Sequence, residues 1–324
     1  MKYLLTISTF FLLLLLTMPT LFVQAAADNE WYILKLKGLE LYRTGQYDRA
    51  VDVTKQALEQ AEKDLGPDHP DVATILNNLA ALYDVQGQYA QAEPLYKRAL
   101  AIYEKTKGPD NLDLTVLLNN LAKIYYAQGQ YAQVEPLYKR VLEIREKALG
   151  PDNPHVANSL NNLAVLYDAQ GQYAQAEPLY KRALTIYEKT KGPDNPDMVT
   201  SLNNLAKLYD VQGQYAQAEP LYKRVLAIRW KTLGPDNIVV ATSLNDLAKL
   251  YSTQGQYELA EPLYIRVVEI KEKTLGPDHP DVAASLTNLA ALYRATKQDE
   301  KANTMEQRAS RIQATTNEAS SKQE

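Results

Sequence analysis

The sequence contains no cysteine among its 324 residues. That absence excludes disulfides, thiolate metal sites and a lipid attached to an amino-terminal cysteine. Histidine is scarce, at three residues, and no Ser-His-Asp set, phosphate-binding glycine loop or metal-ligand spacing occurs. The chain also lacks a basic tract and has a formal net charge of -4, which argues against nucleic acid as the main partner. We therefore expect a protein without catalytic activity, cofactor or metal.

Charge is almost missing from the amino-terminal segment, 1–27, where Lys2 is the single charged side chain. A basic start, a leucine-rich centre and a closing cluster of alanines are the pattern of an export signal with a small-residue cleavage site. We interpret residues 1–27 as this signal, which predicts a periplasmic or secreted protein. The run also exceeds the roughly 20 apolar residues that span a bilayer. The alternative is an uncleaved anchor, with the repeats outside the cytoplasm, and only then is the membrane a partner.

Most of the chain consists of one block that recurs with a 42-residue period. The block carries Gly-Gln-Tyr at Gly45, Gly87, Gly129, Gly171, Gly213 and Gly255, and Gly-Pro-Asp at Gly66, Gly108, Gly150, Gly192, Gly234 and Gly276. A fixed period of about 20 to 50 residues indicates stacked units, each of which needs its neighbours to bury its apolar face. Since no shift in composition interrupts the blocks, we predict one elongated domain over residues 28–314.

Each block reads as two helices joined by a tight turn. In the block that begins at Pro70, proline follows a polar capping residue, His69, as is common at helix starts. Apolar side chains then recur at three- and four-residue steps and share one face; they are Val72, Ile75, Leu76, Leu79, Ala80, Leu82 and Tyr83. Gly87 permits a turn, and a second helix with the same spacing runs from Tyr89 to about Lys105.

This arrangement resembles the tetratricopeptide repeat. The residues that carry the resemblance are Leu79, Ala80, Tyr83, Gly87, Ala92, Tyr96 and Ala99. The longer block, with Leu65-Gly66-Pro67-Asp68 and paired asparagines, is similar to the repeats of kinesin light chains and their bacterial relatives. The resemblance covers about Asn29 to Ala314 and implies an all-α, right-handed superhelical solenoid of about seven helix-turn-helix repeats. No heptad segment of the kind that joins a kinesin light chain to its heavy chain precedes the repeats.

The two ends of the array differ from its centre. The first unit, around Trp31 to Ala61, is atypical, and the last, from Asp281, has Lys297 where the other copies have the turn glycine. Apolar residues on one side of the final helix suit a terminal cap; they are Ala302, Met305, Ala309 and Ile312. We predict a disordered polar tail over residues 315–324.

A second, 84-residue period lies inside the first. The segment from Ala101 to Gly108 returns nearly intact from Thr185, whereas the copies between and after them carry Arg145 and Arg229 at the place of Tyr103 and Tyr187. A duplicated two-repeat block explains the alternation. Similarity among the central repeats therefore partly reflects copying.

Several recurring residues have a structural interpretation. Tyrosines recur at the positions of Tyr83, Tyr89 and Tyr96, on the faces where the repeats pack, so we assign them to the core and not to a stacking platform. Glutamates precede lysines by four residues, as in Glu93 and Lys97, which predicts ion pairs on a solvated helix face worth about 0.2–0.5 kcal/mol each.

The asparagine pairs are the strongest candidates for function. On a helical projection Asn77 points away from the apolar face, which centres near Leu79, and Asn78 lies beside it. In the resembled family this side lines a concave groove, where amides, which both donate and accept, hold the backbone of an extended peptide. The alternative is that one asparagine of each pair bonds a neighbouring helix. The candidates are Asn77, Asn78, Asn119, Asn120, Asn161, Asn162, Asn203, Asn204 and Asn245.

Selectivity should come from positions of this face that vary between blocks. Lys123, Lys207 and Lys249 occupy the position of Ala81, and Tyr126 replaces the aspartate at the position of Asp84. The field is mixed, with a mild bias toward an acidic ligand in the later repeats.

The function we expect is a scaffold that binds a protein or an extended peptide in the concave groove. The alternative is a structural component of the cell envelope that assembles through its convex face or its ends. An enzyme is the third possibility, and no motif supports it.

Overall fold

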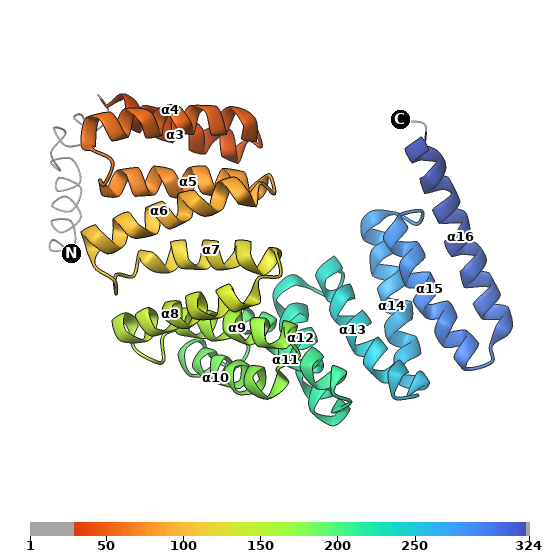
Figure 1. The fold of residues 1–324 in the computed structure, drawn as a ribbon. Coiled ribbons are helices and arrows are strands. Elements are labelled where there is room, and N and C mark those ends of the chain that lie inside the picture. The colour runs from red at the N-terminus through yellow and green to blue at the C-terminus, as the bar shows by residue number, and fades with distance from the viewer. Residues whose placement is uncertain (1–28, 322–324) are drawn as a thin grey trace, which may run out of the picture. The chain divides into compact units, whose positions relative to one another are not determined.

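A computed structural model describes residues 29–321, and this part of the chain contains fourteen α-helices, one 3-10 turn and no strand (Figure 1). The helices form seven pairs, and we refer to the first helix and the second helix of each pair. The first helices are α3 (Glu30–Arg43), α5 (Pro70–Val85), α7 (Leu114–Ala127), α9 (Pro154–Ala169), α11 (Val199–Val211), α13 (Ile238–Thr253) and α15 (Pro280–Ala295). The second helices are α4 (Tyr47–Leu65), α6 (Tyr89–Lys107), α8 (Tyr131–Leu149), α10 (Tyr173–Lys191), α12 (Tyr215–Leu233), α14 (Tyr257–Leu275) and α16 (Asp299–Ser321).

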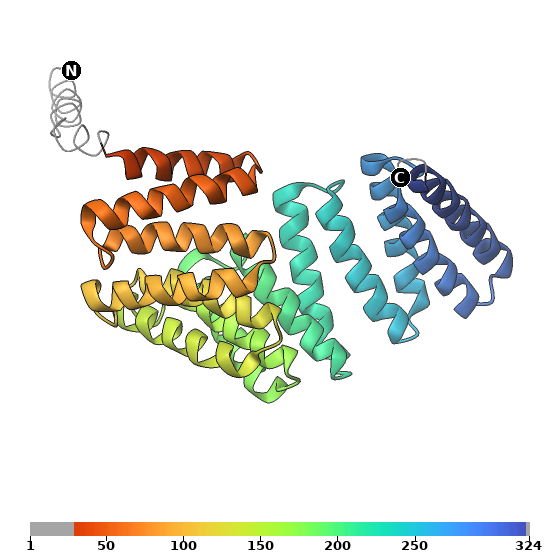
Figure 2. The same ribbon diagram turned by 45° about the horizontal axis from the view of Figure 1, so that its top comes forward.

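The helices group into two compact units that divide between Ala148 and Leu149, where the sequence showed no break in the repeat. The first unit holds α3 to α8, which lie side by side in chain order in both views (Figures 1 and 2). The second unit holds α9 to α16. Neighbour-only packing is the property that lets a repeat array divide in this way. The predicted export segment, residues 1–27, lies outside the described residues.

The apolar face predicted for the first helices is the core. Ile75 and Leu76 of α5 are fully buried, and Leu79 and Tyr83 are at least nine-tenths buried. The equivalent side chains of the other repeats are also buried; they include Leu118, Tyr125, Leu160, Tyr167, Leu202, Tyr209, Leu244, Tyr251, Leu286 and Tyr293. The tyrosines at the positions of Tyr83 and Tyr96 are thus mainly core residues, as predicted, while Tyr89 is half-buried.

The predicted helix starts are present. The backbone N–H of Asp71 donates to Nδ1 of His69 at 3.2 Å, and that of His155 to Oδ1 of Asn153 at 2.9 Å. These side chains replace one of the backbone partners that the first turn of a helix lacks. In the fifth repeat the chain first makes a 3-10 turn, Pro196–Met198, before α11 begins.

The turn between the two helices of a repeat needs a left-handed residue. Gly87 has φ +71°, and the following N–H, of Gln88, donates to the carbonyl of Tyr83 at 2.8 Å. The last repeat makes the same turn with Lys297 at φ +59°, where Gln298 donates to the carbonyl of Tyr293 at 2.8 Å. A side chain in this region clashes with its own backbone, at a cost of roughly 1–2 kcal/mol.

Lys297→Gly is therefore expected to stabilise the protein. Relief of the left-handed strain is partly offset by the greater freedom of glycine in the unfolded chain, which leaves a gain of about 0.5–1 kcal/mol. Urea denaturation of the two proteins measures this difference. Gly87→Ala makes the opposite change at a matched turn and should destabilise; equal stability of Lys297→Gly and the wild type would contradict the strain argument.

Ion pairs join consecutive second helices at a constant interval. Arg98 meets Glu62 and Arg140 meets Glu104, each at 2.5 Å and 36 positions apart, and Arg224–Glu188 and Arg308–Glu272 repeat the contact. Lysines meet the aspartate of a Gly-Pro-Asp loop 37 positions earlier, as in Lys105–Asp68 at 2.5 Å and Lys231–Asp194 at 2.9 Å. Exposed pairs of this kind contribute about 0–1 kcal/mol each, so their main consequence is a fixed register between repeats.

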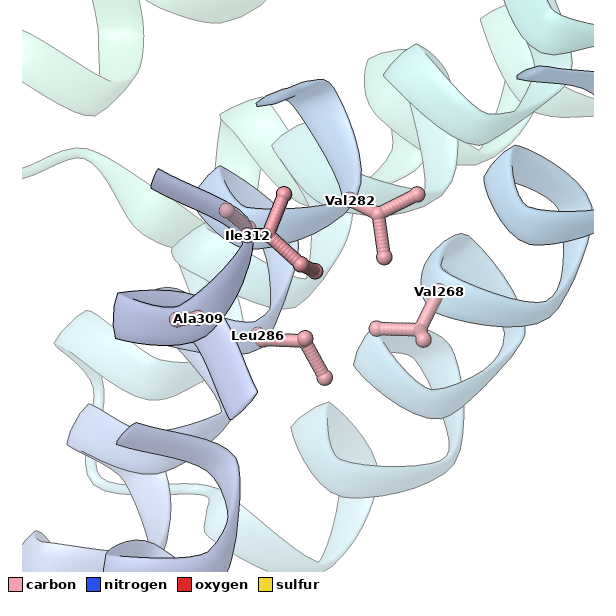
Figure 3. Close-up of a cluster of buried hydrophobic side chains, with 6 residues drawn as sticks. Val268, Val282, Leu286, Ala309 and Ile312 are labelled. Atoms are coloured by element: carbon pink, nitrogen blue, oxygen red, sulfur yellow. The ribbon is translucent and has the colours of Figure 1, made fainter. Parts of the chain in front are cut away.

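The final helix closes the core of the second unit. Ala309 and Ile312 of α16 pack against Val268, Val282 and Leu286 (Figure 3). The predicted cap is thus present, and Ile312 is fully buried. The helix continues to Ser321, where the sequence predicted a disordered tail from residue 315. No proline or glycine interrupts this segment, and the Thr315 hydroxyl donates to the carbonyl of Ile312 at 2.8 Å.

Candidate functional site

Within each unit, the candidate asparagines lie where successive first helices face one another. We use the name asparagine row for the pairs Asn77-Asn78, Asn119-Asn120, Asn161-Asn162, Asn203-Asn204 and Asn245-Asp246 together with Asn288. All members of the five pairs are half-buried, and Asn288 is exposed. The row therefore follows the boundary between the core and the solvent, so its amides can form hydrogen bonds either with protein groups or with groups outside the protein.

Bonds within the row join neighbouring repeats. Nδ2 of Asn120 donates to Oδ1 of Asn77 at 3.2 Å, and Nδ2 of Asn288 donates to Oδ1 of Asn245 at 3.1 Å. Both donors come 43 positions after their acceptors. Ser201 makes a related contact, because its hydroxyl donates to Oδ1 of Asn161 at 3.0 Å. Some of these asparagines therefore bond a neighbouring helix, which was the alternative to groove exposure. The first asparagine of a pair accepts such a bond and the second donates one.

Two carbonyl oxygens of the row have no hydrogen-bond partner within the described residues. These are Oδ1 of Asn119 and Oδ1 of Asn203, both inaccessible to solvent. The equivalent donor position for Asn119 belongs to the second unit. The equivalent donor position for Asn203 is Asp246, whose ionised carboxylate has no N–H to donate. The row of hydrogen bonds is thus interrupted at Asn203, because aspartate replaces asparagine at position 246.

The three lysines of this face differ in their surroundings. Nζ of Lys123 lies 2.7 Å from Oδ2 of Asp84, whose side chain is only 9% exposed. In the first unit, the mixed charges expected on this face therefore form an ion pair. The aspartate of this pair is shielded from solvent, and it neutralises the charge of the lysine. Lys207 and Lys249 are exposed and make no ion pair with another described residue. The free positive charge of the face is in the second unit.

Two aspartates of the second unit, Asp168 and Asp210, are half-buried. Burial raises the pKa of Asp168, and burial also raises the pKa of Asp210 although Lys249 lowers it. Withdrawal from water disfavours the ionised carboxylate in both cases. This face therefore combines exposed ammonium groups with carboxylates that are partly inside the protein.

Several neighbouring groups affect the pKa of Asp246. Burial raises its pKa, Lys207, Arg229 and Lys249 lower it, and the nearby Asp210 carboxylate raises it again. The net direction of the pKa is upward because removal from water outweighs the three positive charges. Asp246 is thus a partly buried acid at the interruption of the asparagine row.

Tyr126 lies at the end of α7, where three other repeats have an aspartate, Asp84, Asp168 and Asp210. It is half-buried, and its ring lies 5.3 Å from the ring of Tyr131, at the start of α8. Aromatic pairs at this separation attract each other beyond their area of contact. Tyr126 is therefore positioned by a residue on the other side of the turn in its own repeat, and part of its side chain remains accessible to solvent.

The sequence did not reveal a second set of contacts between repeats. The hydroxyl of Tyr125 donates to Oε1 of Glu93 at 2.8 Å, and Nζ of Lys97 donates to the same oxygen at 2.6 Å. The group recurs at Tyr209–Glu177 and Tyr251–Glu219, both at 2.9 Å. The predicted ion pairs four residues apart are present, but their glutamates also fix the next repeat. The signal was the constant spacing of 32 positions between glutamate and tyrosine.

These contacts predict a dependence of stability on pH. The pKa of Glu93 is lowered, first by the hydrogen bond from Lys97 and also by that from Tyr125, and Glu177 and Glu219 are affected likewise. A carboxyl whose folded pKa is lowered contributes stability that is present above its unfolded pKa, about 4.3, and is lost as the pH falls through the folded pKa. The triple variant Glu93→Gln, Glu177→Gln and Glu219→Gln should therefore lose less stability than the wild type on acidification.

Urea denaturation near pH 7 and near pH 3 measures this difference. Glu59→Gln, at an exposed position of α4, is the control. Equal losses in the triple variant and the wild type would show that these carboxylates are not linked to folding.

The described residues contain no cluster of three or more His, Asp or Glu side chains arranged to hold a metal ion. Over the same range, no helix combines the length and the apolar character needed to cross a membrane.

Paired helices that bury one face and leave a row of polar side chains along the first helices define a helical repeat scaffold. Comparison with protein families matches the tetratricopeptide repeat at residues 33–105, 112–189, 169–231, 197–273 and 239–315. These segments cover most of the chain, which therefore belongs to the tetratricopeptide repeat family. It is a repeat scaffold of a kind consistent with protein–protein interaction.

Solved structures agree with the resemblance seen in the sequence. BtubC (BKLC) from P. vanneervenii is 25% identical, with a TM-score of 0.62, over 72% of this chain and 92% of that one. A putative kinesin light chain with nearly identical TPR-like repeats, from Podosopora anserina, is 31% identical, with a TM-score of 0.56, over 64% of this chain and 98% of that one. A signal transduction ATPase with a tetratricopeptide repeat sensor, from Pyrococcus horikoshii, shares the fold at 17% identity and a TM-score of 0.70, over 90% of this chain and 44% of that one.

Proposed function

We propose that this protein is an exported scaffold that binds an extended peptide, or an extended segment of another protein, along the first helices. The observation that carries the proposal is the asparagine row, which places half-buried amides at the same position of consecutive repeats. Amides that donate and accept complement a peptide backbone whatever its side chains are. Export rests on residues 1–27, whose composition is that of a signal peptide.

The row has both bonded and unbonded positions, and the unbonded ones are the most informative to change. Asn77 and Asn245 accept hydrogen bonds from the next repeat, so alanine there would weaken the fold. The Oδ1 atoms of Asn119 and Asn203 accept none within the described residues. Alanine at Asn119 and Asn203 removes these amides without breaking a hydrogen bond between repeats in the described part of the chain, and the bond it does break, from Nδ2 of Asn119 to the carbonyl of Thr115 at 2.7 Å, lies within α7.

The test uses a phage-displayed library of random peptides selected against the purified protein. Asn119→Ala with Asn203→Ala is expected to weaken the binding of an enriched peptide by about tenfold or more, since about 1.4 kcal/mol of lost hydrogen bonding corresponds to tenfold. The melting temperature should stay near that of the wild type. Isothermal titration measures the affinity.

Gln175→Ala with Gln217→Ala provides the control, because both glutamines are exposed on second helices. Binding that survives the asparagine changes but not the glutamine changes would move the site to the second helices and overturn the proposal.

A second candidate function, self-assembly through the second helices, is favoured by one departure from the repeat. Trp230 is 43% exposed where most other repeats have glutamate, Leu259 is 51% exposed where the central repeats have glutamine, and Ile265 is 36% exposed where they have lysine. Light scattering at high protein concentration separates the two candidates. A monomer would exclude self-assembly, and an oligomer that Trp230→Glu dissociates would support it.

A further inference from the structure

The second unit contains a cavity of about 670 Å³ near the amino-terminal ends of α9 and of the 3-10 turn before α11. Tyr187 of α10 contributes a side chain that is 3% exposed, and its hydroxyl donates to Oδ1 of Asn158. Thr200 lines the cavity from α11, and Lys191 and Asp197, which form an ion pair, line it as well. We call this cavity the Tyr187 pocket.

The first unit has a second cavity, built from the equivalent positions two repeats earlier. This Tyr103 pocket has a volume of about 250 Å³. The hydroxyl of Tyr103 lies 2.8 Å from Oγ1 of Thr74, and Lys107 pairs with Asp113 at 2.5 Å. The two pockets therefore share a tyrosine, a hydroxyl or amide partner for it, and a lysine–aspartate pair.

The repeat that follows the Tyr187 pocket is constructed differently. Arg229 of α12 replaces the tyrosine, and its guanidinium donates to Oγ of Ser243 at 2.8 Å. Leu233 replaces the lysine of the pair. The alternation over two blocks that the sequence shows therefore distinguishes α6 and α10, which carry the tyrosine and the lysine, from α12, which carries Arg229 and Leu233. Copying explains how the alternation arose, and the pockets are its structural result.

The two pockets differ at the positions that face their openings. In the Tyr187 pocket, Oδ1 of Asn158 is occupied by the tyrosine proton, which leaves its NH2 group as a donor, and the Thr200 hydroxyl is exposed. In the Tyr103 pocket, the hydroxyl of Thr74 is engaged by the tyrosine, and Val116, 54% exposed, replaces Thr200. One wall thus offers hydrogen bonds and the other offers methyl groups.

Charge selects against an ionised guest in the Tyr187 pocket. Apart from His155, the ionisable lysine and aspartate of its lining, Lys191 and Asp197, form an ion pair with each other. A charged side chain would lose water without gaining an opposite charge, which is unfavourable. A carboxamide loses less hydration free energy than a charged group, and it matches the hydrogen-bonding groups of the wall. Its oxygen can accept from Asn158 while its NH2 group donates to Thr200.

We infer that each pocket sets the side-chain preference of the peptide segment bound to its own unit: the Tyr187 pocket of the second unit binds a carboxamide side chain, asparagine or glutamine, and the Tyr103 pocket of the first unit binds a branched aliphatic side chain. This inference rests on the proposed function and adds the chemistry of the ligand to it. Thr74, Val116, Asn158 and Thr200 are then the residues that determine specificity.

Exchange of pocket residues tests the inference with substitutions that the chain already contains. Asn158→Thr with Thr200→Val gives the Tyr187 pocket the walls of the Tyr103 pocket, and Thr74→Asn with Val116→Thr makes the reverse change. Random peptides displayed on phage are selected separately against the wild type and the two exchanged proteins. Circular dichroism and the melting temperature confirm that each variant is folded.

In the wild type, peptides bound to the second unit should be enriched in asparagine or glutamine at one position, and peptides bound to the first unit in valine, leucine or isoleucine at one position. Asn158→Thr with Thr200→Val should turn the carboxamide position to aliphatic residues. For a selected peptide, replacement of its carboxamide residue by leucine should weaken binding to the wild type by about tenfold, as for the loss of one or two hydrogen bonds, and should leave binding to the exchanged protein unchanged or tighter.

The possible failures are distinguishable. Peptides whose binding depends on Asn119 and Asn203, but whose residue preferences are the same for the wild type and both exchanged proteins, would overturn the pocket assignment and leave the proposed function intact. Failure to enrich any peptide, with all proteins folded, would overturn both. Enrichment of charged residues at the position that responds to the Asn158 exchange would overturn the assignment of a carboxamide.

Discussion

Asp246→Asn is expected to raise the free energy of unfolding by about 1–3 kcal/mol, the penalty usually associated with an unsatisfied buried polar group. In two places of the asparagine row, an amide NH2 donates to the Oδ1 that lies 43 positions earlier, from Asn120 to Asn77 and from Asn288 to Asn245. Asp246 occupies the donor position for Asn203 but carries a carboxylate. Asparagine restores the donor and removes a partly buried charge.

The gain should depend on pH in a defined direction. Burial raises the folded pKa of Asp246. The native protein therefore holds a proton at this carboxyl more tightly than the unfolded chain, and wild-type stability rises as the pH falls through the folded pKa toward the unfolded value, about 3.9. The advantage of Asp246→Asn should be largest near pH 7 and should shrink on acidification.

Two matched variants separate the restored bond from the lost charge. Asp210→Asn removes a carboxylate whose pKa burial also raises, without placing an amide at the donor position for Asn203. Asn120→Asp creates the same interruption in the first unit and should destabilise by about the amount that Asp246→Asn gains. Urea denaturation across this pH range measures all three. If Asp246→Asn is no more stable than the wild type near pH 7, the row does not have the register described.

Ile312→Ala is expected to destabilise the second unit by about 2–5 kcal/mol, because truncation of a fully buried side chain leaves a cavity in a packed core. Ile312 lies in the cluster with Val268, Val282 and Leu286. Because α16 ends the array and has no following repeat to hold it, the effect should be concentrated there. Hydrogen exchange of α15 and α16 should increase more than that of α9 and α10.

Arg311→Ala, at the adjacent exposed position of the same helix, is the control and should change stability by less than about 0.5 kcal/mol. Equal losses from the two substitutions would show that the cap contributes through helix propensity alone, and uniform exchange throughout the second unit would show that the cap does not fold as a local element.

Most of the fold could be predicted because each element has a local cause. Apolar residues at helical spacing determine which face of α5 is buried, and Gly87 and the capping residue His69 set its ends. At Lys297 the sequence showed only that the turn glycine is missing, and the structure shows that the lysine adopts the same left-handed turn. The disordered tail from residue 315 stays a prediction, and α16 continues to Ser321.

The candidate site was less predictable because its contacts lie between repeats. A helical projection shows that Asn77 and Lys123 point away from the core of their own helices, but it cannot show that Asn120 or Asp84 from an adjacent repeat meets them. The pockets depend on three helices at once and could not be seen from one block. The sequence feature that indicates the pockets is the alternation of Tyr103 and Tyr187 with arginine. From the sequence alone, this alternation was attributed to copying of a two-repeat block.

The constant interval of the ion pairs between second helices has a consequence for the evolution of this protein. Since the arginines of α6, α8, α12 and α16 meet glutamates 36 positions earlier and several lysines meet aspartates 37 positions earlier, loss or gain of a whole block among these repeats leaves the remaining side chains with partners of the same kind. Loss or gain of two neighbouring blocks together also preserves the alternation of tyrosine-bearing and arginine-bearing second helices. Unequal recombination between such blocks would lengthen or shorten the binding face by one pocket at a time, so that a lineage could alter the length of peptide it recognises without evolving a new fold.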